Sequence, residues 1–180
     1  MGVGKTTVCR ILRDRRENCA FLDGDWCWDM HPFRVTDATR ALVLDNICHI
    51  LGNFLACPEF ENVVFCWVLH EQSIIDAILD RLNLQCVDLR CFCLVCGERE
   101  LRERLHADVN ARLRGADVIE RSVARLPMYE VLRAEKIDVS HITPDEAAGL
   151  ILASTAIEAQ VRFLPVLAFS SCKGGPGALY

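Results

Sequence analysis

Three consecutive residues near the start of the chain carry the clearest chemical signal. Gly4, Lys5 and Thr6 match the end of the pattern G-x-x-x-x-G-K-[ST], and an apolar-faced helical segment follows them directly. Glycines allow backbone N–H groups to turn toward phosphate oxygens, and the N-terminus of the helix adds a favourable dipole. The lysine can then reach the β- and γ-phosphates of a nucleotide, while the threonine hydroxyl can bind Mg²⁺. The residues expected to bind the nucleotide are Gly2, Val3, Gly4, Lys5, Thr6 and Thr7.

Two acidic residues form the second signal. Asp23 and Asp25 end a short apolar run and are separated by a single glycine. Ligands of a parallel sheet bind at the carboxyl ends of its strands, so a strand that ends here presents both carboxylates to a ligand. We expect Asp23 to be the catalytic base and to hold Mg²⁺ with Thr6, and Asp25 to orient the substrate. The alternative is a polar turn in which Asp25 caps a helix.

Arginines gather in the segment 111–117, ARLRGAD, and in the helical stretch that follows it. Arg112 and Arg114 lie in a predicted mobile loop, and Arg121 and Arg125 share one face of the next helix because they are four residues apart. Guanidinium groups can neutralise the charge on a phosphoryl group in transfer. We expect Arg114 and Arg121 to act in catalysis. The alternative is a solvated basic face that pairs with nearby glutamates.

Further candidates lie where an acceptor would bind. Arg34 and Arg40 occur close to aromatic residues that could wall a pocket, namely Trp26, Trp28 and Phe33. His70 follows the buried run NVVFCWVL, at the place where an acidic metal ligand or a substrate ligand is expected. We therefore expect Asp25, Arg34, Arg40 and His70 to contact the substrate. Ordinary packing at a loop and at a strand end is the alternative for these residues.

Charge and hydropathy limit the classes of partner. The formal net charge of −5 leaves no broad basic surface, so we expect no nucleic-acid partner. No apolar stretch reaches the roughly 20 residues that a membrane span needs, so we expect no membrane partner either. The remaining expectation is a small-molecule acceptor bound at local arginines.

The cysteines bear on location and on metal binding. The chain has 11 of them, an odd number without a regular framework, which favours free thiols in a reducing cytoplasm over a disulfide scaffold. Cys91, Cys93 and Cys96 form a tempting metal-binding run. However, no second cysteine pair or histidine pair completes a site, so we interpret them as core residues of a strand.

The hydrophobic pattern alternates between helical and strand periods along the chain. This alternation predicts an α/β fold, namely a three-layer, doubly wound parallel sheet covered by helices on both faces. Pro127 should kink or divide the helix in which it lies. The predicted strands are 19–25, 62–69, 88–96 and 136–142, and the predicted helices are 8–17, 38–56, 71–83, 98–110, 118–132 and 143–157.

Both ends of the chain depart from this pattern. The first glycine of the phosphate-loop pattern, and the central strand that delivers the loop, would fall before Met1, so we expect this first strand to be missing. A truncated start is the favoured explanation, and a damaged product is another. A third is that the apolar segment 161–169 fills the vacancy, which Pro165 opposes because it lacks an N–H donor. We expect a domain over 1–157, with a lid at about 111–117, and an irregular or disordered tail over 158–180.

Several of these segments together resemble known kinases. MGVGKTT, the LDGD segment and a late arginine-bearing stretch together resemble the gluconate, shikimate and adenylylsulfate kinase group of P-loop proteins. The longer segments LDGDWCW, FCWVLHEQSIID and DVIERSVARLPMYE are similar to bacterial nucleotide-kinase-like ATPases. The resemblance runs from Met1 to about Ile157. It implies ATP as donor, Mg²⁺ as cofactor and an arginine-bearing lid. The expected function is transfer of the γ-phosphoryl group of ATP to a small hydroxyl or phosphate acceptor; the alternative is a truncated P-loop protein that binds nucleotide without catalysis.

Overall fold

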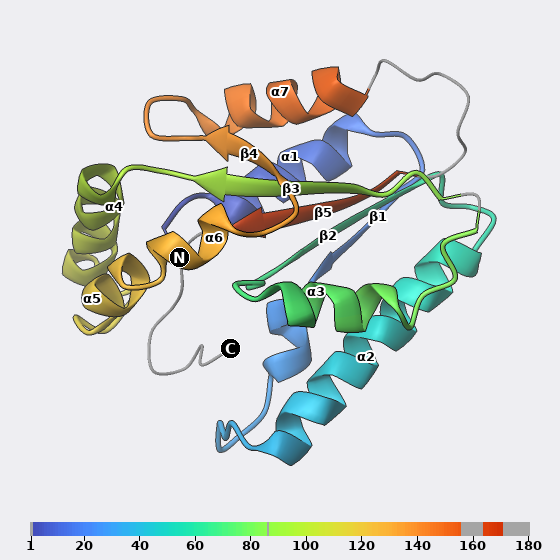
Figure 1. Ribbon diagram of the computed structural model, residues 1–180, viewed down its shortest axis with the longest axis horizontal. Helices are drawn as coiled ribbons and strands as arrows, with labels where there is room; N and C mark the ends of the chain where they lie inside the picture. The colour runs from blue at the N-terminus through green and yellow to red at the C-terminus, as the bar shows by residue number, and fades with distance from the viewer. Residues whose placement is uncertain (1, 86, 156–163, 171–180) are drawn as a thin grey trace.

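A five-stranded parallel β-sheet organises the computed structural model of the chain (Figure 1), which describes residues 2–85 and 87–155 together with the backbone of 164–170. The order of strands across the sheet is β1-β2-β5-β3-β4, and every pairing is parallel. The strands are β1 (Cys19–Asp23), β2 (Asn62–Trp67), β3 (Arg90–Val95), β4 (Glu135–Asp138) and β5 (Leu164–Ser170). The prediction of an α/β fold with a parallel sheet is therefore confirmed.

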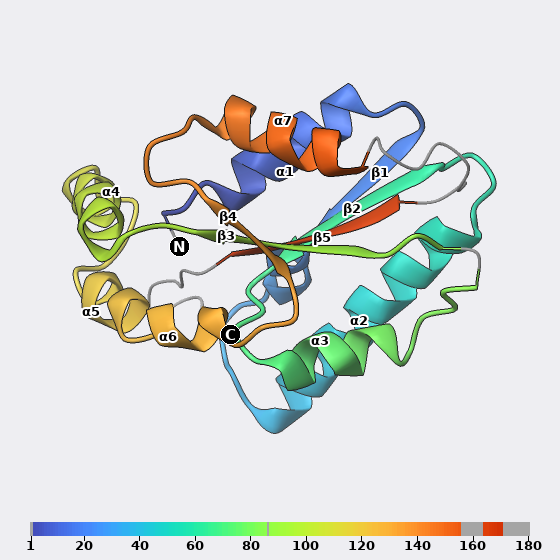
Figure 2. The same ribbon diagram turned by 45° about the horizontal axis from the view of Figure 1, so that its top comes forward.

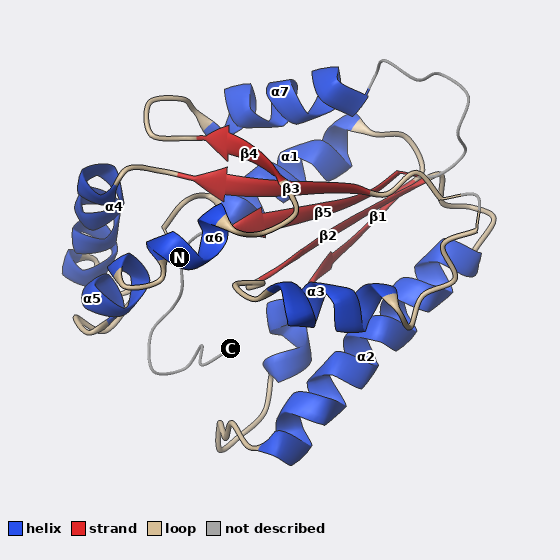
Figure 3. Cartoon of the chain, in the orientation of Figure 1, coloured by secondary structure: helices blue, strands red, loops and turns tan. Residues whose placement is uncertain are grey.

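Helices alternate with the strands along the chain (Figure 3). Proline divides the stretch 118–132 as expected, because Pro127 lies in the first turn of a separate short helix. In the part of the chain that the structure describes, no helix is long and apolar enough to cross a membrane. The helices are α1 (Lys5–Arg15), the 3₁₀ helix η1 (Gly24–Trp28), α2 (Asp37–Ala56), α3 (Gln72–Leu79), α4 (Glu98–Asn110), α5 (Val118–Val123), α6 (Leu126–Glu130) and α7 (Pro144–Thr155).

Two hydrophobic clusters cover the two faces of the sheet. Successive side chains of a strand point to opposite faces, so a strand buried on both sides reads as a continuous apolar run, as β2 does. One cluster joins α1 and α7 to one set of strand residues, which includes Phe21, Val64, Cys66, Phe92 and Leu94. The other joins α2 and α3 to the alternate set, which includes Leu22, Val63, Phe65, Trp67 and Cys93. Figure 2 shows these two helix pairs on opposite sides of the sheet.

The segment 164–170 lies in the middle of the sheet, which corrects the prediction of an irregular tail for these residues. It forms β5, which pairs with β2 on one side and with β3 on the other, and so occupies the position that we expected to be vacant. Without it, backbone groups of β2 and β3 would be left unpaired in the interior. The remaining tail residues, 158–163 and 171–180, lie outside the described residues.

The objection raised by Pro165 fails for a positional reason. Pro165 is the second residue of β5 and is paired with Val63 of β2, whereas the pairing of β5 with β3 begins only at Val166. Proline is tolerated at the start of a strand because the missing N–H lies at the end of the ladder. The proline thus precedes the part of β5 that is bonded on both sides.

The helix starts follow local capping chemistry. Thr36 caps α2, and its side chain accepts a hydrogen bond from the Thr39 N–H at 3.2 Å. Thr143 caps α7, since its hydroxyl accepts a hydrogen bond from the Glu146 N–H at 3.2 Å and the Glu146 carboxylate accepts one from the Thr143 N–H at 2.7 Å. Both helices begin with the reciprocal capping arrangement.

The central position of β5 predicts that substitutions at two of its residues change the free energy of unfolding by different amounts. Ala168 pairs with Cys66 and with Phe92, so an Ala168→Pro substitution removes an N–H from a strand that is bonded on both sides. We expect it to lower the free energy of unfolding by about 2–4 kcal/mol. Pro165→Ala is the matched control, with an expected change of about 1 kcal/mol or less. Urea unfolding followed by circular dichroism measures both; equal midpoints for Ala168→Pro and wild type would contradict the central placement.

Candidate functional site

The phosphate loop has the backbone shape that the glycine pattern predicts. Gly2 and Gly4 adopt φ values of 83° and 88°, a left-handed region that other residues rarely enter. Gly2 also lacks space, because a Cβ atom there would lie 3.0 Å from Leu105 Cδ2. Gly4 is the N-cap of α1 and offers no side chain to its first turn, in which the first intrahelical bond joins the Val8 N–H to the Gly4 carbonyl at 2.9 Å. The N–H groups of the first turn are thus available to an anion.

One cleft of about 310 Å³ joins this loop to residues from distant parts of the chain. It brings together the loop, the acidic turn after β1, the last turn of α4 and the segment between α4 and α5. Four residues predicted to act together therefore share one cleft, namely Lys5, Thr6, Asp25 and Arg114. The lining residues are Gly2, Val3, Gly4, Lys5, Thr6, Thr7, Asp25, Asp108 and Arg114.

Lys5 is a buried cation at the floor of this cleft, with 9% of its surface exposed. Burial acts to lower its pKa, whereas Cys66, Asp25 and Asp23 act to raise it, and the net result lies above the ordinary value for lysine. Lys5 therefore stays protonated at neutral pH. A buried charge of this kind is costly, and the negative charges of the two aspartates offset part of that cost.

Asp23 links the acidic turn to the phosphate loop. Its Oδ2 accepts a hydrogen bond from the Thr6 hydroxyl at 2.8 Å, and its Oδ1 accepts from the Asp25 N–H at 3.1 Å. Asp23 is 4% exposed and caps η1, so the alternative in which Asp25 is the cap is wrong. Both carboxylate oxygens of Asp23 are engaged beneath the cleft, while Asp25 lines it.

Gly24 allows the chain to turn between the two acids. Trp67 of β2 packs directly on it, and a Cβ atom at Gly24 would lie 2.5 Å from Trp67 Cγ. Only glycine fits under the indole ring without a shift of the backbone. The close contact between Gly24 and Trp67 therefore sets the path of η1, which carries Asp25 to the cleft.

The donor set at this point suits Mg²⁺. The Thr6 hydroxyl and the Asp23 carboxylate are hard oxygen donors held 2.8 Å apart, at the mouth of an anion-binding loop. Among the described residues, no group of three or more histidine, cysteine or acidic side chains is arranged to hold a metal. A magnesium ion held by one or two protein oxygens together with substrate phosphates and water is the arrangement that this ion prefers.

Other predicted residues do not line the cleft. Arg121 pairs with Asp117, with Nη2 2.7 Å from Oδ2. Arg40 pairs with Asp37 at 3.3 Å and has 63% of its side chain exposed. The predicted substrate and catalytic residues outside the cleft lining are Asp23, Arg34, Arg40, His70 and Arg121.

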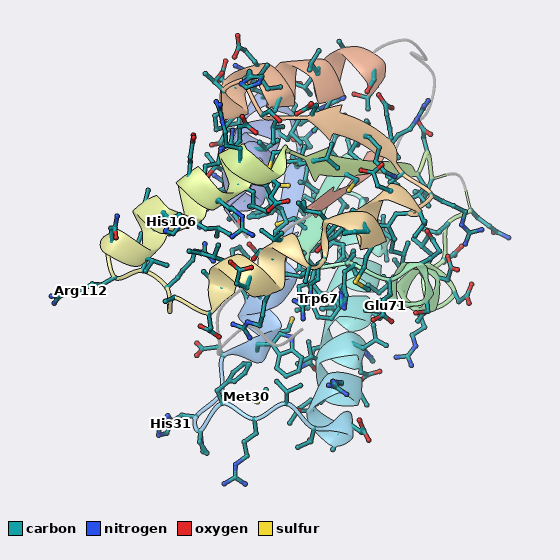
Figure 4. All side chains as sticks on the ribbon, turned by 60° about the vertical axis from the view of Figure 1, so that its left-hand side comes forward. Met30, His31, Trp67, Glu71, His106 and Arg112 are labelled. Carbon is teal, nitrogen blue, oxygen red and sulfur yellow. The ribbon has the colours of Figure 1, made fainter. Side chains whose placement is uncertain are left out.

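Two further lid candidates and the histidine that follows β2 also lie outside the cleft lining. Figure 4 shows Arg112 projecting away from the body of the protein, in agreement with its exposed side chain. His70 follows β2 by three residues, and its Nε2 lies 3.2 Å from Oε1 of Glu71. Arg125 precedes α6 and is likewise absent from the cleft lining. Of the arginines predicted to form the lid, the structure thus places only Arg114 in the cleft lining.

Sequence reasoning missed Asp108 and Arg104, which are two of the many charged residues of α4. Asp108 lines the main cleft, and Arg104 lines a second, largely apolar cavity of about 230 Å³ on the other side of the loop. Arg104 donates from Nη2 to the carbonyls of Val139 and Ser140, at 2.6 and 3.2 Å. The residues that line this second cavity are Gly2, Val3, Gly4, Val8, Arg104, Val139, Ile142, Pro144 and Ala147.

Backbone geometry predicts different outcomes for Gly→Ala substitutions in the phosphate loop and in α2. Gly4→Ala places a side chain at φ 88°, so we expect it to strain the loop and to weaken binding of inorganic triphosphate about tenfold or more. Gly52→Ala in α2 meets open space and should raise the free energy of unfolding by about 0.5–1 kcal/mol. Calorimetric titration and urea unfolding of both variants measure these effects. Unchanged triphosphate binding by Gly4→Ala would rule out the loop as the anion site.

Comparison with known proteins agrees with this geometry. A sequence profile of the family described as AAA domain matches residues 1–124, which include the phosphate loop, the acidic turn and Arg114. No curated protein matches the chain. The family is P-loop NTPase-like and includes kinases and ATPases, which indicates a nucleotide-binding P-loop domain. Since the match spans more than half of the 180 residues, the chain belongs to the AAA domain family.

Proposed function

We propose that this protein is an ATP-dependent small-molecule kinase, which transfers the γ-phosphoryl group of ATP to a small hydroxyl or phosphate acceptor with the help of Mg²⁺. One observation carries the proposal: Lys5, Asp25 and Arg114 line a single cleft at the N-terminus of α1. Phosphoryl transfer depends on positioning and on neutralising charge, and a cleft with these groups offers both. The finer assignment within the P-loop fold, a doubly wound kinase domain, is part of the same proposal.

The second cavity supports a nucleoside triphosphate as the donor. It adjoins the same loop residues, Gly2 to Gly4, so a nucleotide with its phosphates on the loop can extend into it. Its lining is mainly apolar and suits the face of a base, and the Arg104 guanidinium is held in place there by two backbone carbonyls. The phosphate end and the base end thus occupy two adjoining, chemically different spaces.

Magnesium would be held by Thr6 and Asp23. When bound, the ion would supply positive charge to the phosphates of the nucleotide. The hydrogen bond between the two side chains keeps their oxygens adjacent before the ion arrives. Lys5, buried and protonated, adds a fixed positive charge to the same phosphates.

The geometry divides the roles of the two acids differently from the sequence prediction. Asp23 was expected to be the base, but both of its oxygens accept hydrogen bonds, from Thr6 and from the Asp25 backbone. Asp25 lies in the cleft lining, where an acceptor hydroxyl would approach. We therefore assign proton acceptance from the substrate to Asp25 and metal binding to Asp23.

The alternative of a truncated, inactive P-loop protein depended on a vacancy at the centre of the sheet. Because β5 occupies that position, the alternative loses its main support. We keep a cytoplasmic location, a small-molecule acceptor and the lack of a nucleic-acid or membrane partner as proposals. A thermal-shift and ADP-release screen of hydroxyl and phosphate metabolites, each with Mg²⁺–ATP, tests the reaction directly.

Lys5 provides the first test of nucleotide binding. Lys5→Ala removes a buried positive charge from the phosphate site, so we expect Mg²⁺–ATP to bind about 10- to 100-fold more weakly. Arg10→Ala, on the exposed side of the same helix, is the control and should bind ATP as wild type does. Isothermal titration calorimetry measures both. Tight ATP binding by Lys5→Ala would defeat the assignment of this loop to the phosphates.

The two acids provide a test of catalysis. Asp25→Asn should leave Mg²⁺–ATP affinity nearly unchanged while lowering turnover about 10²- to 10⁴-fold, because proton transfer is lost. Asp23→Asn should raise the concentration of Mg²⁺ required for half-maximal rate, because it weakens the metal site. Steady-state rates measured across a magnesium titration separate the two effects. If Asp25→Asn turns over at the wild-type rate, Asp25 is not the base.

A further inference from the structure

The turn that carries Arg114 folds back onto the end of α4. Arg112 adopts φ 56°, the left-handed conformation that commonly ends a helix. The Arg112 N–H donates to the Val109 carbonyl and the Leu113 N–H to the Asp108 carbonyl, both at 2.9 Å. These bonds reverse the chain direction, so the side chain of Arg114 returns to the level of Asp108.

Arg114 and Asp108 form a partly buried ion pair inside the cleft. Arg114 Nε donates to Asp108 Oδ2 at 2.7 Å, and the two side chains are 21% and 28% exposed. A charge-assisted bond of this length and burial restricts the guanidinium more than an exposed pair does. The pair is therefore able to fix the orientation of Arg114.

The rest of the guanidinium faces a different environment. Nη1 of Arg114 is buried and has no hydrogen-bond partner among the described residues, although both Arg114 and Asp108 line the cleft beside the phosphate loop. A buried donor without a partner is costly, and an anion in the cleft would supply the missing acceptor. One edge of the guanidinium is thus held by the protein and another remains for a ligand.

We propose that Asp108 is a positioning residue, which holds the Arg114 guanidinium so that its terminal nitrogens meet the phosphoryl group in transfer. The proposal rests on the kinase function proposed above and names a residue that acts through Arg114. Arg121 lacks this arrangement, because it pairs with Asp117 outside the cleft lining. Of these two arginines, only Arg114 is thus held in the cleft by a carboxylate, that of Asp108.

A double-mutant cycle tests the proposal by ATP hydrolysis and kinase turnover. Arg114→Ala should lower kcat about 10²-fold, and Asp108→Ala about tenfold, with the KM for ATP changed less than about twofold. Asp108→Asn keeps an oxygen acceptor and should restore most of the rate. The double variant Asp108→Ala/Arg114→Ala should match Arg114→Ala, because Asp108 acts only through that arginine. Glu103→Ala, which removes an exposed partner of Arg99 on the same helix, is the control and should behave as wild type.

Binding of ADP with Mg²⁺ and aluminium fluoride, a mimic of the transferring phosphoryl group, supplies a second readout that needs no turnover. Asp108→Ala should weaken this complex while sparing Mg²⁺–ATP. Additive losses in the cycle, or a faster Asp108→Ala variant, would overturn the proposal, because Asp108 would then act through the fold or compete with phosphate. A wild type that fails to bind Mg²⁺–ATP would instead refute the kinase function, so the two failures are distinguishable.

Discussion

The two hydrogen-bonded ladders of β5 join the halves of this protein. On one side β5 pairs with β2, which carries β1 and the acidic turn; on the other it pairs with β3, which leads to α4 and Arg114. If the strand were absent, the two halves would share no ladder, and the groups that line the cleft would have no common frame. The geometry of the site thus depends on backbone bonds made by residues near the far end of the chain.

A second constraint is electrostatic. The cleft combines a buried lysine, Asp25 and a pair formed by Arg114 and Asp108, and the buried Asp23 lies next to Asp25 at the end of β1. Each buried charge has an opposite charge nearby, which offsets the cost of removing it from water. In such a partly buried site, charges act on a ligand more strongly than they would in open solvent. The charges that stabilise one another in the folded protein are therefore the same charges that would act on a phosphate-bearing ligand.

Burial of the cysteines affects the pKa of their thiols and so their reactivity. The nine cysteines among the described residues are free. Burial raises the pKa of Cys19 to about 11, against a smaller lowering by Arg16, and raises the pKa of Cys91 to about 11. At neutral pH these thiols stay protonated, and they behave as small apolar side chains.

The sequence by itself determined the parts of this protein that depend on local chemistry. The glycine pattern of residues 2–6, the strand periods and the break at Pro127 are all properties of short segments, so each could be inferred from neighbouring residues. The tertiary structure decided what depends on distant contacts. It placed β5 between β2 and β3 despite Pro165, gave Asp23 rather than Asp25 the capping role, and joined Asp108 to Arg114. Such pairings are set by which strands need a partner and which charges share a buried space, and no local pattern encodes either.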